Sequence, residues 1–336
     1  MKQAMFQEKK EGGKVLCGLC SHRCLIPDGK RGICAVRENR DGILYSLVYD
    51  KIIAQNIDPI EKKPLFHFLP GSLSYSIAAP GCNFRCLHCQ NADISQLPHE
   101  RQGDLPGQPI LPRAMIDSAR AYRCASISYT YTEPTIYFEI AYDTSLLAAE
   151  SGLKNVFVTN GYITPEALKT LAPVLHAANI DLKGFTDNFY KKICGARLQP
   201  VLDAITLYKK LGIWIEITTL VIPGHNDSEA ELRGIAEFIK SVGEDIPWHV
   251  SRFHPTYKLL DQPVTPVETL HRARQIGIDA GLRYVYMGNV PGDGEDTRCW
   301  HCTKTIVKRT GFNVQENRIV DGKCSYCGSV IDGAWG

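Results

Sequence analysis

The sequence lacks both a long apolar run and an excess of charge of either sign. No window approaches the number of consecutive apolar residues that crosses a bilayer, and no apolar run follows the lysine at the start, as a secretory signal requires. The 38 basic and 36 acidic residues leave a formal net charge of +2. This balance gives no sign of a nucleic-acid surface or a membrane partner. We therefore expect a cytoplasmic, soluble protein that binds neither nucleic acid nor membrane.

Cysteine, in contrast, is abundant, with 13 in a chain of 336 residues. In a reducing compartment, cysteines at short spacings bind metal more often than they form disulfides. Three groups have such spacings: Cys17, Cys20, Cys24 and Cys34; Cys82, Cys86 and Cys89; and Cys299, Cys302, Cys324 and Cys327. Cys124 and Cys194 stand alone, and we expect them to be core residues. The sequence thus predicts four-thiol sites near both ends and an unusual three-thiol site between them.

Between the two quartets, short apolar runs alternate with helical patterns. The expected strands are 73–80, 125–131, 154–160, 178–183, 214–222 and 248–254, and the clearest helices are 164–177, 228–243 and 267–281. Thr164 and Ser228 are expected N-caps, and Gly281 an expected C-terminal cap. The alternation indicates βαβ units and a parallel sheet, either doubly wound or a partial barrel. We expect this α/β domain at 71–290, with cysteine-rich modules at 1–70 and 291–336.

The central motif is "PGCNFRCLHCQN", with the spacing C-x3-C-x2-C. Iron–sulfur clusters are usually held by four cysteine thiolates, so three thiolates leave one iron without a protein ligand. An incomplete ligand shell is what a catalytic metal needs, because the substrate occupies the vacant position. The alternative is a zinc site completed by His88 or His99.

Polar residues also stand at the ends of later strands, where the sites of α/β barrels form. Glu133 ends the second expected strand, and Thr159 and Asn160 end the third. Asp181 and Lys183 share one face of the fourth strand with Asn179. An acid and a base on an inward face require each other or a polar ligand, because a strand buried in an α/β core is normally apolar.

The two terminal quartets predict closed metal sites. The C-terminal "CWHC" and "CSYCG" pairs have the spacing of a zinc ribbon, although a rubredoxin-like iron site uses the same ligands. The N-terminal "CGLCSHRC" with Cys34 fits zinc or an auxiliary [4Fe-4S] cluster, and zinc is slightly preferred.

The C-x3-C-x2-C motif after the first strand resembles that of the radical S-adenosylmethionine (radical SAM) enzymes. The segments "CGLCSHRC", "SYTYTEPT", "NIDLKG", "VIPGHND", "SRFHP" and "YMGNVPG" extend the resemblance to the AmmeMemoRadiSam-system enzymes, which are relatives of pyruvate formate-lyase-activating enzyme. This resemblance implies a partial (β/α)6 TIM-like barrel with small cysteine-rich metal modules at both ends. It also implies a [4Fe-4S] cluster on the three central cysteines, with S-adenosylmethionine on the fourth iron.

The same resemblance implies roles for individual side chains. The residues expected to bind the cluster or S-adenosylmethionine are Cys82, Cys86, Cys89, His88, Glu133, Thr159, Asn160, Asp181, Lys183, Thr218 and His254, with His249 and Arg252 lining the cavity. Lys183 joins the three cysteines as an expected catalytic residue. Two departures stand out: Val158 replaces an aspartate that relatives often carry, and Tyr131 and Thr132 replace two glycines.

Three functions follow as expectations. In the first, the 5′-deoxyadenosyl radical abstracts hydrogen from an unidentified substrate, which is a small molecule or a protein, with a Memo-type partner and a one-electron donor of the flavodoxin or ferredoxin type. In the second, the protein activates a glycyl-radical enzyme. The third is a different class, a non-catalytic zinc-binding adaptor with a degenerate barrel.

Overall fold

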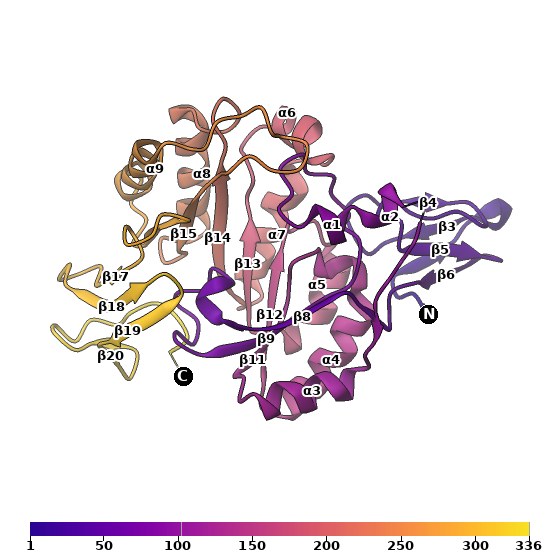
Figure 1. Cartoon of the computed structure of the whole chain (residues 1–336), viewed down its shortest axis with the longest axis horizontal. Helices are drawn as coiled ribbons and strands as arrows, with labels where there is room; N and C mark the ends of the chain where they lie inside the picture. The colour runs from indigo at the N-terminus through magenta and orange to yellow at the C-terminus, as the bar shows by residue number, and fades with distance from the viewer. Residues whose placement is uncertain (102, 336) are drawn as a thin grey trace.

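An eight-stranded sheet forms the centre of the molecule in a computed structural model that describes residues 1–101 and 103–335 (Figure 1). From one edge to the other its strands are Val285–Gly288 (β16), Trp248–Arg252 (β15), Trp214–Val221 (β14), Ala177–Asp181 (β13), Lys154–Thr159 (β12), Ser126–Tyr129 (β11), Leu73–Ala78 (β9) and Ala54–Pro59 (β8). Neighbouring strands from β9 to β16 pair in parallel, and β8 pairs antiparallel with β9. Because the parallel strands follow chain order without a reversal, the sheet is a partial barrel and not a doubly wound sheet.

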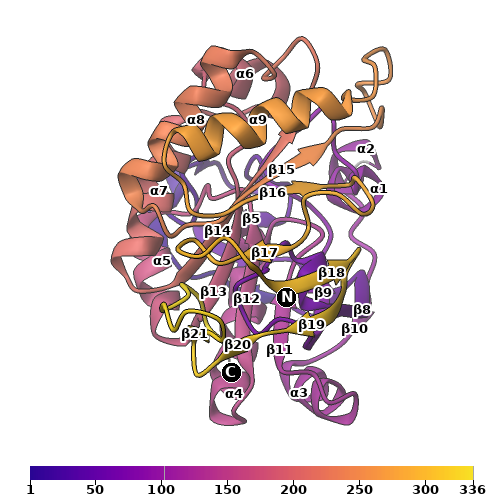
Figure 2. The ribbon, with the colours of Figure 1, turned by 90° about the vertical axis from the view of Figure 1, so that its left-hand side faces the viewer.

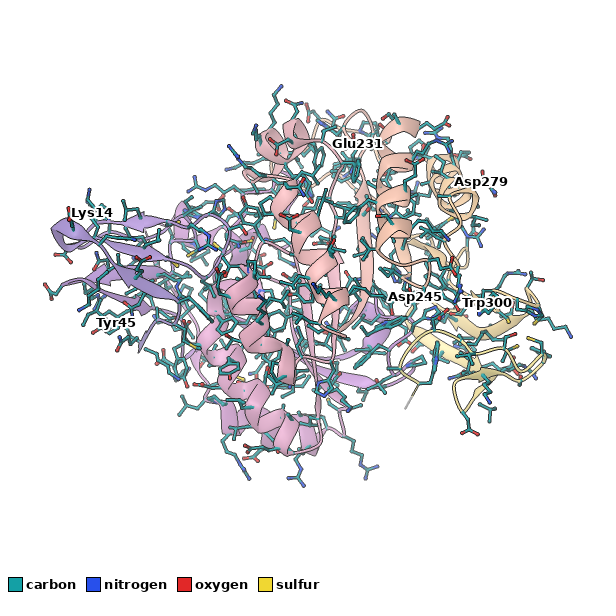
Figure 3. The ribbon with its side chains drawn as sticks, turned by 180° about the vertical axis from the view of Figure 1, so that it is seen from behind. Lys14, Tyr45, Glu231, Asp245, Asp279 and Trp300 are labelled. Carbon is teal, nitrogen blue, oxygen red and sulfur yellow. The ribbon has the colours of Figure 1, made fainter. Side chains whose placement is uncertain are left out.

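Helices cover the outer face of this sheet, as Figures 1 and 3 show from opposite sides. The longer ones are α3 (Pro112–Ala121), α4 (Phe138–Glu150), α5 (Pro165–Leu171), α7 (Gln199–Lys210), α8 (Glu229–Val242) and α9 (Val267–Asp279). Shorter turns are α1 (Ala92–Ser95), α2 (Leu97–Glu100), α6 (Asp187–Phe189), η2 (Ile60–Lys62), η3 (Pro134–Tyr137), η4 (Ala172–Val174) and the π-helix η5 (Tyr190–Cys194). Within the described residues, no helix is both long and apolar enough to span a bilayer.

All six expected strands are confirmed, and so are the three expected helices. The Thr164 and Ser228 side chains accept hydrogen bonds from the backbone N–H groups of Ala167 and Glu231, as predicted for N-caps. The helix expected at 164–177 ends six residues earlier than predicted. It stops at Leu171, and a short 3-10 turn that contains Pro173 leads directly into β13.

The two cysteine-rich modules lie at opposite ends of the long axis. In Figure 3, Lys14 and Tyr45 mark the N-terminal module and Trp300 marks the C-terminal one. The N-terminal module consists of β1 (Lys2–Gln3), β2 (Gln7–Lys9), η1 (Glu11–Gly13), β3 (Val15–Cys17), β4 (Leu25–Ile26), β5 (Arg37–Arg40) and β6 (Ile43–Ser46). Its strands form two three-stranded sheets, β1-β6-β5 and β2-β3-β4. A two-stranded pair, β7 (Lys51–Ile52) and β10 (Gln108–Pro109), lies beyond it in the chain.

The C-terminal module packs beside β8, β9 and β16 (Figure 2). It consists of β17 (Thr297–Arg298), β18 (Thr305–Thr310), β19 (Asn313–Asn317), β20 (Ile319–Val320) and β21 (Lys323–Cys324). Its last residues return to the sheet, since Ala334 exchanges backbone hydrogen bonds with His67 and Leu69. The module therefore contacts the segment that follows β8 as well as the end of the chain's last parallel strand.

The segment at residues 60–69, which we call the inner segment, lies against β13 and β14. Glu216 on β14 is fully buried and accepts hydrogen bonds from the backbone N–H groups of Phe66 and His67, at 3.0 and 2.8 Å. Asn179 on β13 donates to the Pro64 carbonyl at 2.8 Å. The inner segment therefore occupies part of the space that the curved sheet encloses.

His67 gives the fold a specific pH dependence. Burial lowers its pKa to about 4, and its two ring nitrogens contact the Asp332 carbonyl and the Tyr286 hydroxyl. As the pH falls below about 6.5, the unfolded chain takes up a proton that the folded protein does not, so stability decreases down to about pH 4.

We expect this one residue to remove about 3 kcal/mol of unfolding free energy between pH 7 and pH 4. The measurement is urea unfolding of the wild type and of His67→Gln across this range. Groups shared by both proteins cancel, so the stability difference between them should shrink as the pH falls. A difference that stays constant with pH would contradict the assignment.

Candidate active site

The three central cysteines lie on a loop that leaves the end of β9. Gly81 begins the loop at φ +106°, and a Cβ atom there would lie 2.8 Å from Val36, so glycine is required. The loop is fixed against the π-helix η5, because the N–H groups of Arg85 and Leu87 donate to the carbonyls of Cys194 and Ile193 at 2.8 and 2.9 Å. π-helices are rare and frequently mark functional sites.

A cavity of about 560 Å³ opens beside this loop. Nearly all the side chains predicted for the site line it: Cys82, Cys86, His88, Cys89, Glu133, Thr159, Asn160, Asp181, Lys183, Thr218 and His249. They come from the cysteine loop, from the C-terminal ends of β11, β12 and β13, and from positions within β14 and β15, so the parallel sheet brings them to one cavity. Val158, Tyr131 and Thr132, the departures from the family pattern, line the same cavity.

Two predicted residues lie elsewhere. His254 is exposed and is not part of the lining, because β15 ends at Arg252 and the chain then turns away. Arg252 donates from Nε to the Thr265 carbonyl at 2.8 Å and does not line the cavity either. The prediction that Arg252 lines the cavity is therefore wrong.

Glu133 is a buried organiser of the strand ends and not a surface turn residue. Its Oε1 accepts from the Thr135 N–H at 3.0 Å and from the hydroxyls of Thr135 and Thr159 at 2.6 and 2.7 Å. Its Oε2 accepts from the Asn160 N–H at 2.8 Å. Burial raises the pKa of this carboxyl even though these bonds favour its charged form. The Oε2 atom keeps an acceptor lone pair for a ligand in the cavity.

Asp181 and Lys183 form an ion pair of 2.8 Å at the end of β13. Although burial lowers the pKa of the lysine, the Asp181 carboxylate and the Cys86 thiolate outweigh this effect and raise it well above its ordinary value. The lysine is therefore a fixed positive charge beside the cysteine loop. The alternation of polar residues in "NIDLKG" had predicted this inward placement.

Two buried polar atoms in the loop have no partner within the described chain. They are Nδ1 of His88 and Nδ2 of Asn83. Burial and the nearby Lys183 charge lower the pKa of His88 to about 3, so its ring is neutral. Unpaired buried polar groups are costly unless a ligand or water satisfies them. His88 and the three thiols line the cavity, and they fit a site that receives a cluster and a polar cosubstrate.

The zinc alternative for the central cysteines finds no support in the geometry. Within residues 1–101 and 103–335, the C-terminal quartet is the only group of three or more Cys, His, Asp or Glu side chains whose ligand atoms all lie within 4.8 Å of one another. Neither His88 nor His99 completes such a group with the central thiols. The three thiols are thus not arranged around a single tetrahedral ion.

The C-terminal quartet, by contrast, can hold a single metal ion. The Sγ atoms of Cys299 and Cys327 are 3.7 Å apart, and those of Cys302 and Cys324 are 3.8 Å apart. A tetrahedral ion with metal–sulfur bonds of about 2.3 Å separates its ligands by about 3.8 Å. The predicted metal-binding arrangement is therefore present at this end of the chain.

The sequence did not reveal the part of the cavity wall that comes from the inner segment and the C-terminal module. Glu61, Lys63, Phe66 and Phe312 all line the cavity. Lys63 pairs with Asp58 at 2.7 Å, and burial lowers the lysine's pKa to about 8. The sequence did contain one related signal, because Glu216, like Asp181, is an acidic residue inside an apolar strand. Its Oε2 lies 2.7 Å from Nε2 of His249, which lines the cavity.

Comparison with known proteins agrees with this site. The family model described as the radical SAM superfamily matches residues 76–236, which include the three cysteines and the ends of β11 to β14. An uncharacterised protein of Methanocaldococcus jannaschii is 51% identical over 336 residues, which cover 99% of both chains. The pyruvate formate-lyase-activating enzyme of Clostridium pasteurianum is 24% identical over 213 residues, covering 60% of this chain and 87% of that protein.

Solved structures share the fold. A radical SAM methyltransferase from Sphaerobacter thermophilus superposes with a TM-score of 0.51 at 16% identity, covering 66% of this chain and 67% of that one. Streptococcus suis SuiB bound to S-adenosylmethionine gives a TM-score of 0.52 at 14% identity, covering 68% and 53%. The narrower AmmeMemoRadiSam resemblance is not confirmed by these comparisons. With its α/β fold, its cavity and its C-x3-C-x2-C loop, this chain contains a radical SAM superfamily domain at residues 76–236.

Proposed function

We propose that the protein is a radical SAM enzyme that abstracts a hydrogen atom from a substrate still to be identified. The observation that carries this proposal is the cavity, which gathers three open-spaced cysteines with Glu133, Asp181 and Lys183. Cys82, Cys86 and Cys89 would hold a [4Fe-4S] cluster, which would supply the electron for reductive cleavage of S-adenosylmethionine.

The chain's own residues would bind and orient the cosubstrate. Glu133 and the Asn160 region offer acceptors for the ammonium group of S-adenosylmethionine, and Lys183 offers a positive charge to its carboxylate. Asp181 holds the lysine in place. Phe66 and Phe312 add apolar surface to the cavity wall, which helps to exclude water from a reactive radical.

Two substrates remain candidates under this proposal. The first is a small molecule or a protein, handled with a Memo-type partner. The second is the glycine of a glycyl-radical enzyme, and the similarity to pyruvate formate-lyase-activating enzymes favours it. In both, a one-electron donor of the flavodoxin or ferredoxin type would supply the electron. The adaptor hypothesis is weaker, because a degenerate barrel has no need of buried, unpaired polar atoms in its cysteine loop.

The test is an assay for 5′-deoxyadenosine after anaerobic reconstitution with iron and sulfide and reduction by dithionite. We expect the nucleoside to form, and we expect deuterium from a labelled substrate to appear in it. Parallel reactions with a glycyl-radical protein and with small molecules then identify the substrate class. Absence of S-adenosylmethionine cleavage in protein that contains the cluster would refute the enzyme proposal.

Replacement of Lys183 by Met tests the cosubstrate site directly. We expect the KM for S-adenosylmethionine to rise by about 10- to 100-fold, because the loss of a charge-assisted hydrogen bond costs about 1.5–3 kcal/mol. The matched control is Lys192→Met, since Lys192 is exposed on the π-helix η5 and lies outside the cavity lining. An unchanged KM in Lys183→Met would remove this lysine from the binding site.

A further inference from the structure

The three cysteine groups of the chain differ in how closely their sulfur atoms approach. The C-terminal quartet is compact, with Sγ pairs at 3.7 and 3.8 Å, and matches the geometry of one tetrahedral ion. The sulfur atoms of the three active-site cysteines, proposed above to hold a four-iron cluster, do not all lie within 4.8 Å of one another. The chain therefore contains one compact and one widely spaced cysteine group. Both can be compared with the N-terminal quartet: Cys17, Cys20, Cys24 and Cys34.

The N-terminal quartet resembles the active-site cysteines, because its sulfur atoms are also widely spaced. In the described part of the chain, no three of its sulfur atoms lie mutually within 4.8 Å. Its four cysteines instead line one cavity, which leaves about 10 Å³ for the centre of a water-sized sphere. Four thiolates at about 2.3 Å from a zinc ion leave no such space at their centre.

The surroundings of this cavity suit a buried cluster with negative charge. Three of the four cysteines are buried, and Arg37, which is also buried, lines the same cavity. The N–H group of Ile33 points to Cys24 Sγ at 3.5 Å. Hydrogen bonds to sulfur and burial from solvent are two means by which proteins tune iron–sulfur clusters.

A histidine that might replace a thiol is engaged elsewhere. His22 contacts the Asn83 carbonyl through Nε2 at 2.8 Å, and Asn83 follows the active-site Cys82. The backbone of the quartet also pairs with the barrel, since the Ser21 N–H donates to the Tyr162 carbonyl at 3.0 Å. The N-terminal quartet thus keeps four thiol ligands and directly adjoins the active-site loop.

From the spacing, the central cavity and its surroundings, we propose that Cys17, Cys20, Cys24 and Cys34 hold a redox-active iron–sulfur cluster of the [4Fe-4S] class and not a zinc ion. This proposal reverses the slight preference for zinc that the sequence alone gave. It does not depend on the proposed enzymatic function, because it is tested by metal content and spectroscopy without any turnover.

The experiment compares the wild type with Cys82→Ala/Cys86→Ala/Cys89→Ala, both full-length and reconstituted anaerobically with iron and sulfide. We expect about eight iron atoms per wild-type chain and about four in the triple variant, which should still show the visible absorbance and the reduced-state electron paramagnetic resonance of a cluster. Zinc should remain at one ion per chain, from the C-terminal quartet.

A further pair of variants assigns the remaining iron. Adding Cys20→Ser and Cys34→Ser to the triple variant should remove it, whereas adding Cys124→Ser, a change outside every group, should not. Circular dichroism checks that each variant folds. If the five-residue variant misfolds, the iron content of the folded wild type still decides. Four iron atoms and two zinc ions in the wild type, or a triple variant without iron, would overturn the proposal.

Discussion

Replacement of Cys86 by alanine is expected to lower the formation of 5′-deoxyadenosine by at least about 1,000-fold, which corresponds to about 4 kcal/mol in activation free energy. Cys86 is buried at the centre of the cysteine loop and lines the cavity. Loss of its thiolate leaves the cluster with two protein ligands, so the iron that should deliver the electron is lost or displaced. The measurement is product formation under dithionite, together with iron content.

The matched control for this prediction is Cys124→Ala, which removes a lone buried cysteine that does not line the cavity. It should retain activity, with a loss of stability typical of a small core change. Near-normal activity in Cys86→Ala would contradict the assignment of the cluster to this loop. Loss of activity in both variants would point to a general effect on folding, which circular dichroism would reveal.

The second large effect concerns stability. Arg37→Met should lower the free energy of unfolding by about 3–5 kcal/mol, because it leaves a buried carboxylate without its cation. Arg37 pairs with Glu139 through two hydrogen bonds of 2.9 and 3.2 Å, and both side chains are at most 2% exposed. This pair joins β5 of the N-terminal module to α4 of the barrel. Urea unfolding of the reconstituted protein measures the loss.

Two further variants separate the buried charge from the loss of packing. Arg37→Met/Glu139→Gln should recover much of the stability, because it leaves no unpaired buried charge. In the wild type Glu139 accepts a hydrogen bond from the Met5 N–H at 2.8 Å, and the amide oxygen of glutamine can still accept it. Arg40→Met removes an exposed arginine and should cost less than about 1 kcal/mol. Equal losses of unfolding free energy in Arg37→Met and Arg40→Met would show that the buried pair stabilises the fold no more than an exposed pair does.

The sheet could be predicted from local patterns where strands are apolar and long. The two strands that were not expected are β8 and β16. The first has the sequence "AQNIDP", whose polar residues suit an exposed edge, and the second has only four residues. The first therefore lacks the apolar run on which the other six predictions rested, and the run in the second, "VYMG", is only three residues long.

Much of the site could be predicted because α/β barrels place their active sites at the C-terminal ends of their strands. Glu133, Asp181 and Lys183 were found because polar residues interrupt apolar strands at those ends. The inner segment and Phe312 were not, because they reach the cavity through contacts between residues far apart in the chain. His254 follows β15 by two residues, and only the path of the backbone decides that it turns outward.

The inner segment has a further consequence for how the molecule assembles. His67 binds the Asp332 carbonyl across 265 residues of sequence, and Ala334 completes a bridge with Phe68. Contacts of such long range form late, because the chain must first lose the entropy of closing a large loop. During synthesis from the N-terminus, these contacts cannot form before residues 332–334 have left the ribosome. Iron and sulfide would therefore be able to reach the cysteine loop before the inner segment is fixed in place.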